Sequence, residues 1–409
     1  MKKYYKIFSS VLKIFSSVLI CCIPLSLITY FAVPWKSYPT ISSAGSSALQ
    51  PLVTEFSDKW NSNTDLIVQG GGSGFGMKSI ATSTKDIGAA SKNTYDSAYK
   101  ATMAKNGYTI ETWEDKAIKT LTIGWDSIAI VYKISDQNKK LELKANDGSL
   151  SKLYKMFSGI RQYTVEELIP GTSSKGFFIP YGRTGGAKAS GTATSFMYES
   201  TFNWDYWKQN DPELKEAENA LKSGSYLNNN VRTTNESNVE AWNKVKYENY
   251  DNSIIYLSLA FALQNYDDLQ KNGFRIATFE GVNPVEYIRE NSNVDINFLQ
   301  KYKWFSPFNL MISLNEANQY TKEFIEWVYL SDEAKKVFNN QKIVPVDKTE
   351  YFKAMIAPSL EFKDMKTDFQ QVFNPINGDV SLEKLNNKPS EDKSDKYFGI
   401  AKNVILKQE

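Results

Sequence analysis

The apolar residues of the chain follow two spacings, one typical of buried strands and one typical of helices. Continuous apolar runs rich in β-branched residues predict buried strands at residues 121–134 and 308–314. Apolar residues three and four positions apart predict amphipathic helices at residues 150–157 and 320–330. Further strands are expected at residues 65–69 and 86–91, and further helices at residues 212–222 and 236–245. A buried apolar segment is expected at residues 253–263. This alternation is typical of an α/β fold with mostly parallel sheets.

Three predicted strands are each followed by a loop rich in glycine and serine and then by a helix. These loops lie at residues 44–51, 70–79 and 183–192. The first N–H groups of a helix have no partner within the helix and carry the positive end of its dipole. Glycine lets a ligand approach the backbone closely. Because the carboxyl ends of parallel strands meet at one edge of a sheet, the three loops predict one shared site for an oxyanion.

Individual residues of these loops supply the expected donors. In the first loop Ser46 or Ser47 is expected to cap the helix. Arg183 adds a planar, charged group that suits an oxyanion. Ser91 ends the strand at residues 86–91, where a helix cap or a turn is an equally good interpretation. A strand, a loop and a capped helix with no ligand would also explain any one of the loops taken alone.

Two familiar catalytic motifs are absent from the second loop. Met77 separates Gly76 from Lys78, so the Gly-Lys-Ser/Thr sequence of a P-loop is missing. Phe75 stands where a nucleophile elbow requires its second glycine. The loop therefore favours neither phosphate hydrolysis nor an esterase.

The composition excludes further classes of site. The chain has no histidine, which excludes imidazole catalysis and histidine-ligated metals. Its only cysteines, Cys21 and Cys22, lie in the apolar N-terminal segment, so the rest of the chain has no disulfide or thiolate site. Residues 1–36 hold five lysines and no acid, and the remainder has 43 basic and 46 acidic residues. This balance gives no support to a nucleic-acid partner.

The N-terminal segment predicts a membrane anchor. Residues 14–33 carry no charge and are long enough to span a bilayer. The lysines before this run predict that the N-terminus is inside and the body is on the extracytoplasmic side. A cleaved signal peptide, or lipidation at Cys21 or Cys22, are the alternatives.

Taken together, residues 44–60, 69–91 and the arginine-to-SGTATSF stretch at 183–196 resemble the phosphate-binding protein of the high-affinity phosphate ABC transporter. The resemblance covers most of residues 42–346. It implies a two-lobed periplasmic-binding-protein type II fold, with a hinge and a ligand cleft between the lobes. The expected parts are the anchor at 1–36, lobe I at 37–120 and 305–347, lobe II at 121–304, and a partly mobile C-terminal extension at 348–409.

The resemblance also implies a set of phosphate-binding residues. They are Ser46, Ser47, Ala48, Ser73, Ser91, Arg183, Ser190, Gly191 and Thr192. Two features depart from the family. Six residues separate Arg183 from Ser190, where the family often has three. Ser91 stands where the family often has an aspartate that accepts a proton from the phosphate, and a serine imposes no charge penalty on sulfate.

The function implied is that of a membrane-anchored, extracytoplasmic receptor that binds inorganic phosphate and delivers it to an ABC import permease. It would act as a monomer, without catalysis, cofactor or metal. A receptor for sulfate or molybdate, and a surface adhesin on the same fold, are the alternatives. A phosphoryl-transfer enzyme would need a carboxylate cluster or a nucleophile with its base, and the sequence shows neither.

Overall fold

The computed structural model describes residues 38–60, 63–91, 116, 118–184, 191–197 and 202–345. The predicted anchor and the C-terminal extension lie outside these ranges. The chain divides into two compact units at Pro39, and the elements described below belong to the second unit. Within the described ranges, no helix has both the length and the apolar character needed to cross a membrane.

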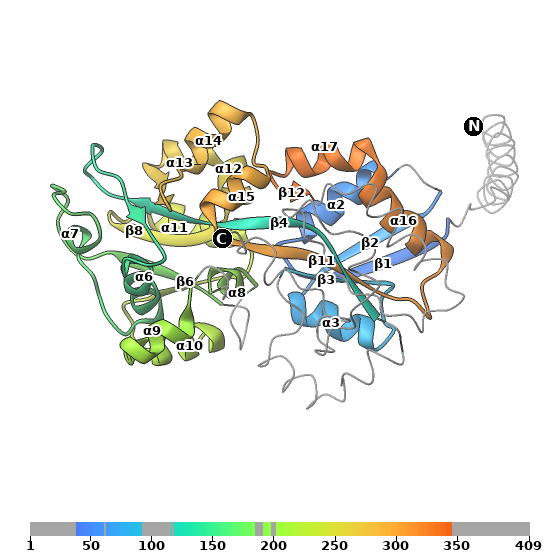
Figure 1. The fold of residues 1–409 in the computed structure, drawn as a ribbon, viewed down its shortest axis with the longest axis horizontal. Coiled ribbons are helices and arrows are strands. Elements are labelled where there is room, and N and C mark those ends of the chain that lie inside the picture. The colour runs from blue at the N-terminus through green and yellow to red at the C-terminus, as the bar shows by residue number, and fades with distance from the viewer. Residues whose placement is uncertain are drawn as a thin grey trace, which may run out of the picture. The chain divides into compact units, whose positions relative to one another are not determined.

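One mixed sheet runs through the second unit (Figure 1). Its strands, in spatial order, are β2 (Asp65–Gly70), β1 (Thr40–Gly45), β3 (Ile87–Ala90), β11 (Phe305–Ser313), β4 (Ile118–Lys133), β8 (Ser253–Ser258), β6 (Ile179–Arg183) and β7 (Arg232–Thr234). Two further strands, β9 (Phe274–Ile276) and β12 (Val344–Pro345), pair with β4. A separate pair is formed by β5 (Glu142–Leu143) and β10 (Thr278–Phe279).

Each helix that the apolar spacing predicts is confirmed, with ends within a few residues of those expected. The helices are α2 (Gln50–Lys59), α3 (Ser73–Ala81), α6 (Ser149–Ser158), α7 (Val165–Leu168), α8 (Gly191–Phe196), α9 (Trp204–Asn210), α10 (Glu213–Ser223), α11 (Asn238–Glu248), α12 (Leu259–Gln264), α13 (Tyr266–Lys271), α14 (Pro284–Asn291), α15 (Ile296–Tyr302), α16 (Gln319–Leu330) and α17 (Asp332–Asn340). The buried stretch at 253–263 changes from strand to helix at Ser258, whose hydroxyl accepts a hydrogen bond from the Phe261 N–H.

Parallel pairing is confined to the two ends of the sheet, because β11 and β4 run antiparallel through its middle. At one end β1 lies between β2 and β3, and at the other β6 lies between β7 and β8. In each of these triplets of parallel strands, the chain therefore runs from the central strand to one neighbour and then crosses over the central strand to reach the other neighbour. Since such crossovers are right-handed, α2 and α3 lie on opposite sides of β1 (Figure 1). Ligands in sheets of this kind bind at the carboxyl ends of the strands where the order reverses.

β4 connects the two triplets by changing its partner. It pairs with β11 up to Ser127 and with β8 from Ile128 onward. Ile128 marks the exchange, because its N–H donates to Trp304 O at 3.1 Å and its carbonyl accepts from the Tyr302 hydroxyl at 2.7 Å. The lobe boundary at residue 121 remains a prediction, and the exchange of partners lies further along the same strand.

A buried carboxylate lies next to this exchange. Asp126 is 6% exposed, and its Oδ1 accepts hydrogen bonds from Ser127 N at 2.8 Å and Ala260 N at 3.2 Å. Burial raises the pKa of Asp126 from 3.8 to about 6, although hydrogen bonds from Ser258, Ala260 and Ser127 oppose the rise. Asp126 thus joins β4 to the first turn of α12 at the cost of holding a charge in the interior.

We expect Asp126→Asn to stabilise the protein above the pKa of the buried carboxylate. The folded state holds this proton more tightly than the unfolded state. The stabilisation that this tighter proton binding contributes is therefore fully present below the unfolded pKa of 3.8, and it is lost as the pH rises through about 6. By pH 7 the variant should be more stable by roughly 3 kcal/mol. Urea unfolding of both proteins across this pH range measures the difference.

The exposed Asp58 on α2 provides the control, because Asp58→Asn makes the same substitution at the surface and should change stability by less than about 0.5 kcal/mol at neutral pH. A difference between Asp126→Asn and the parent that does not vary with pH would contradict the assignment.

Candidate anion-binding site

Three serines meet at the carboxyl ends of β1, β2 and β3. Ser46 follows β1, Ser73 begins α3 after β2, and Ser91 follows β3. The Ser46 hydroxyl donates to Ser91 Oγ at 2.7 Å, and the Ser91 N–H donates to Ser73 Oγ at 3.1 Å. The two hydroxyls of Ser73 and Ser91 lie 3.5 Å apart. The parallel strands thus bring three sequence-distant hydroxyls, all buried, into one cluster.

The first loop reaches this cluster through a turn that precedes its helix. Ser46 O accepts from Leu49 N at 3.1 Å and from Gln50 N at 3.0 Å, and Ser46 Oγ accepts from Ala48 N at 3.2 Å. α2 begins only at Gln50, and Leu49 precedes it without a side-chain cap. The expectation that Ser46 or Ser47 caps α2 is therefore wrong. Ser47 is half-buried in the turn, and its hydroxyl bonds to none of the described residues.

Two glycines of the second loop allow α3 to approach the sheet. Gly72 precedes the helix with a φ of +84°, which side chains rarely adopt. A Cβ on Gly76 would lie 2.5 Å from Ala89 O and 2.8 Å from Ala44 O. The helix therefore packs directly on the backbones of β1 and β3. This close packing is what places Ser73 beside Ser91.

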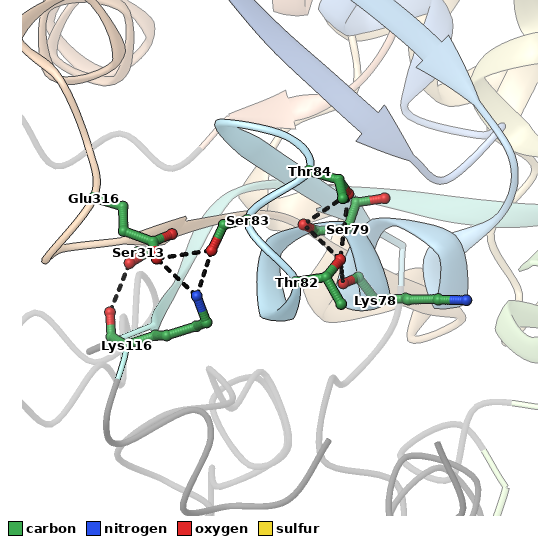
Figure 2. Close-up of polar contacts among 8 residues, drawn as sticks. All are labelled: Lys78, Ser79, Thr82, Ser83, Thr84, Lys116, Ser313 and Glu316. Carbon is green, nitrogen blue, oxygen red and sulfur yellow. Dashed lines mark hydrogen bonds and ion pairs between the residues drawn. The ribbon is translucent and has the colours of Figure 1, made fainter. Parts of the chain in front are cut away.

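The opposite end of α3 is held by a polar network (Figure 2). The Ser83 hydroxyl donates to Glu316 Oε1 at 2.7 Å, and Lys116 Nζ donates to the same oxygen at 2.7 Å and to Ser83 Oγ. The Ser313 hydroxyl, at the end of β11, donates to Lys116 O at 2.7 Å (Figure 2). Thr82 Oγ1 donates to Lys78 O at 2.8 Å and closes the last turn of the helix. Both ends of α3 are thus positioned by residues distant in sequence.

Arg183 ends β6 and is completely buried. Its Nε donates to Asn235 O at 2.8 Å, and its Nη1 donates to Asn238 Oδ1 at 2.9 Å and Tyr256 O at 3.3 Å. Its Nη2 donates to Glu236 O. These bonds use four of the five guanidinium N–H groups. Burial lowers the pKa of Arg183 to about 10, so the side chain stays charged at neutral pH.

The bonds of Arg183 hold the loop between β7 and α11, which the sequence did not associate with the site. Within this loop, the N–H of Glu236 donates to Asn235 Oδ1 at 2.6 Å. The Glu236 carboxylate faces the start of α3, where its Oε1 lies 3.2 Å from the position of a Cβ on Gly72. Two tyrosines hold the arginine backbone, because Tyr256 accepts from Arg183 N at 3.0 Å and Tyr226 donates to Arg183 O at 2.5 Å.

The helix start predicted at residues 190–192 is described in part. Ser190 lies outside the described residues, Gly191 begins α8, and Thr192 is buried on that helix. α8 is anchored by Phe196, which stacks on Tyr256 with ring centroids 4.2 Å apart. The Trp304 indole N–H donates to Phe196 O at 3.2 Å.

Ser195 on α8 connects this helix to the serine cluster. Its hydroxyl donates to Ser91 O at 3.3 Å and accepts from the Ser306 hydroxyl at 2.9 Å. Ser195 is not among the site residues predicted from the sequence, although it lies three positions after Thr192 and hence on the same side of the helix. Within the described ranges no group of three or more acidic, histidine or cysteine side chains is arranged to hold a metal ion.

Comparison with known proteins identifies one relative by sequence and several by fold. No family model matches the chain. The chain is 30% identical over 364 residues to the "Uncharacterized lipoprotein MG412" of Mycoplasma genitalium, covering 83% of this chain and 92% of the relative. This identity over nearly the whole length of the relative shows common membership of one protein family.

Several solved structures with the same fold are described as phosphate-binding proteins. The Phosphate-Binding Protein from Stenotrophomonas maltophilia has a TM-score of 0.52 at 12% identity, covering 78% of this chain and 93% of its own. A Clostridium perfringens protein assigned as a phosphate ABC transporter substrate-binding protein, with bound phosphate, has a TM-score of 0.50 at 17% identity. It covers 75% of this chain and 99% of its own. At these identities the likeness shows the fold. The chain therefore belongs to the family of the Mycoplasma genitalium lipoprotein, and it has the α/β periplasmic-binding fold of the phosphate ABC transporter substrate-binding proteins.

Proposed function

We propose that this protein is an extracytoplasmic receptor that binds inorganic phosphate and delivers it to an ABC import permease. The observation that carries the proposal is the cluster of Ser46, Ser73 and Ser91 at one sheet edge. α8 contacts the same cluster through Ser195. Hydroxyl and backbone N–H groups at helix starts are suited to bind a tetrahedral oxyanion.

The proposed ligand set is the one that the resemblance implies. The loops that follow β1, β2 and β3 would bind the anion through Ser46, Ser47, Ala48, Ser73 and Ser91. The start of α8 would bind it through Ser190, Gly191 and Thr192. The remaining N–H of Arg183 Nη2 would add one charged donor. Neutral donors predominate in this set, so the anion is satisfied without a concentration of positive charge that would slow its release.

The membrane arrangement follows from the N-terminal segment. We propose that residues 1–36 tether the body to the extracytoplasmic face of the cell membrane, as a span or through a lipid on Cys21 or Cys22. The name of the Mycoplasma genitalium relative, a lipoprotein, supports a tether. We propose that the protein acts as a monomer with an ABC permease as its partner. The assignment of the Clostridium perfringens protein to an ABC transporter supports the permease partner.

The change of partner along β4 suggests how binding is signalled. We propose lobe I at residues 37–120 and 305–347, lobe II at 121–304, and a hinge in β4 and β11 where they connect the two triplets. Closure would exclude water from the anion and strengthen each hydrogen bond. A closed and an open state would then differ in the surface presented to the permease.

Titration calorimetry with phosphate tests the proposal on the full-length chain, purified in detergent and freed of bound anion. We expect the parent protein to bind phosphate and Ser73→Ala to bind it roughly 10- to 100-fold more weakly, because one hydrogen bond to a charged ligand is lost. The exposed Ser223 at the end of α10 provides the matched control, and Ser223→Ala should bind as the parent does.

Binding of sulfate or molybdate in place of phosphate would assign the receptor to that anion. Failure of the parent protein to bind any of these oxyanions would overturn the proposal and favour an adhesin.

We also expect Arg183→Lys to destabilise the protein in the absence of phosphate. Lysine keeps the charge but has three donors in place of five, so oxygens of the loop at 235–238 would lose their hydrogen-bond donors. The loss should be roughly 2 kcal/mol or more in urea unfolding. Arg161→Lys, at an exposed arginine, should change stability by less than about 0.5 kcal/mol. Equal stability of the two variants would show that Arg183 does not organise the loop.

A further inference from the structure

One buried hydroxyl connects the two parallel triplets beside the serine cluster. Ser195 lies on α8, which packs on β6 and β8 of one triplet. Its hydroxyl donates at 3.3 Å to the carbonyl of Ser91, which follows β3 in the other triplet. The same hydroxyl accepts from Ser306 near the start of β11 at 2.9 Å. Because all three residues are buried, loss of these bonds would be costly, and they hold α8 against the end of β3.

The backbone of Ser91 is hydrogen-bonded by side chains from both triplets. The pairing of β3 in the sheet ends at Ala89 on the β1 side and at Ala90 on the β11 side, so Ser91 lies beyond it. The Ser91 N–H donates to Ser73 Oγ at 3.1 Å, and the Ser91 carbonyl accepts from Ser195. The first bond orients the peptide before Ser91, and the second orients the peptide after it.

These two peptides determine where the Ser91 hydroxyl lies. Its oxygen accepts from the Ser46 hydroxyl at 2.7 Å and lies 3.5 Å from Ser73 Oγ. A hydroxyl oxygen that accepts a hydrogen bond becomes a stronger donor through its own proton. A shift of the backbone at Ser91 would move its Cβ and disturb both distances. Ser195 can therefore affect the donors of the serine cluster without touching an anion itself.

We propose that Ser195 is a positioning residue, which holds the hydroxyls of Ser46, Ser73 and Ser91 in their anion-binding arrangement from the opposite triplet. The inference rests on the proposed phosphate-binding function, and it assigns Ser195 no contact with the phosphate. The bonds of Ser195 to Ser91 and Ser306 join groups of the protein alone, so they order the cluster before the anion arrives. Donors ordered in advance bind more tightly, because less conformational freedom is lost on binding.

A double-mutant cycle tests the proposal by phosphate titration calorimetry on the full-length chain, purified in detergent and freed of bound anion. The variants are Ser195→Ala, Ser91→Ala and the double variant. We expect Ser195→Ala alone to weaken phosphate binding about 10-fold. In the Ser91→Ala background the same change should weaken binding by no more than about threefold, because the hydroxyl that Ser195 positions is already absent.

Ser158→Ala provides the matched control. Ser158 is a buried serine on α6, and its hydroxyl donates to Lys155 O at 2.9 Å. This variant also removes a buried serine hydroxyl and its hydrogen bond to a carbonyl, from a helix that packs on β6. Since Ser158 has no bond to the serine cluster, the control should bind phosphate as the parent protein does.

Each other outcome has a defined meaning. A parent protein that binds no phosphate overturns the proposed function, and this inference with it. If the parent protein binds phosphate and Ser195→Ala binds it equally well, the role of Ser195 alone is overturned. An equal loss in both backgrounds also overturns it, because Ser195 would then act independently of Ser91. If thermal unfolding shows that Ser195→Ala is not folded, Ser306→Ala takes its place in the same cycle, since it removes the donor to the Ser195 hydroxyl. It too should weaken binding less in the Ser91→Ala background.

Discussion

The structure depends on one antiparallel pair of strands, β4 and β11, which connects two parallel triplets. Each triplet reverses its strand order at the central strand, so its loops gather at the carboxyl ends of its strands. Taken alone, neither triplet would assemble the candidate site, because the serines belong to one and Arg183 and Glu236 to the other. β4 passes from pairing with β11 to pairing with β8 without interruption. The register of this single strand therefore relates the two sets of loops.

Two of the buried charged side chains tie neighbouring segments to the sheet. Asp126 joins β4 to α12, and Arg183 joins β6 to the loop before α11. An isolated buried charge is costly, and both groups offset part of this cost through hydrogen bonds to the backbone. Because burial penalises the charged state, the pKa of Asp126 is raised and the pKa of Arg183 is lowered. The loops they hold are consequently tied to the interior rather than to solvent.

The serine cluster gives the candidate site a particular chemistry. Its three buried hydroxyls are neutral hydrogen-bonding groups that come from the ends of three different strands. The loop before α11, which Arg183 holds through hydrogen bonds to residues 235, 236 and 238, brings the Glu236 carboxylate to Gly72 at the start of α3. Groups from both triplets therefore meet in the same region.

The local pattern of the sequence by itself determined the helices, most of the strands and the three loops rich in glycine and serine. Helices such as α6 and α16 follow from apolar spacing, which is a local property, and the absence of histidine excludes imidazole chemistry whatever the fold. The contact between Ser46 and Ser91, the antiparallel course of β11, and the approach of Glu236 to Gly72 join residues that are far apart in the chain. Such contacts depend on strand order and register, which no short segment of sequence encodes. The oxygens of the loop before α11 that surround the Arg183 guanidinium are likewise distant from it in the chain, so only the tertiary structure brings them together.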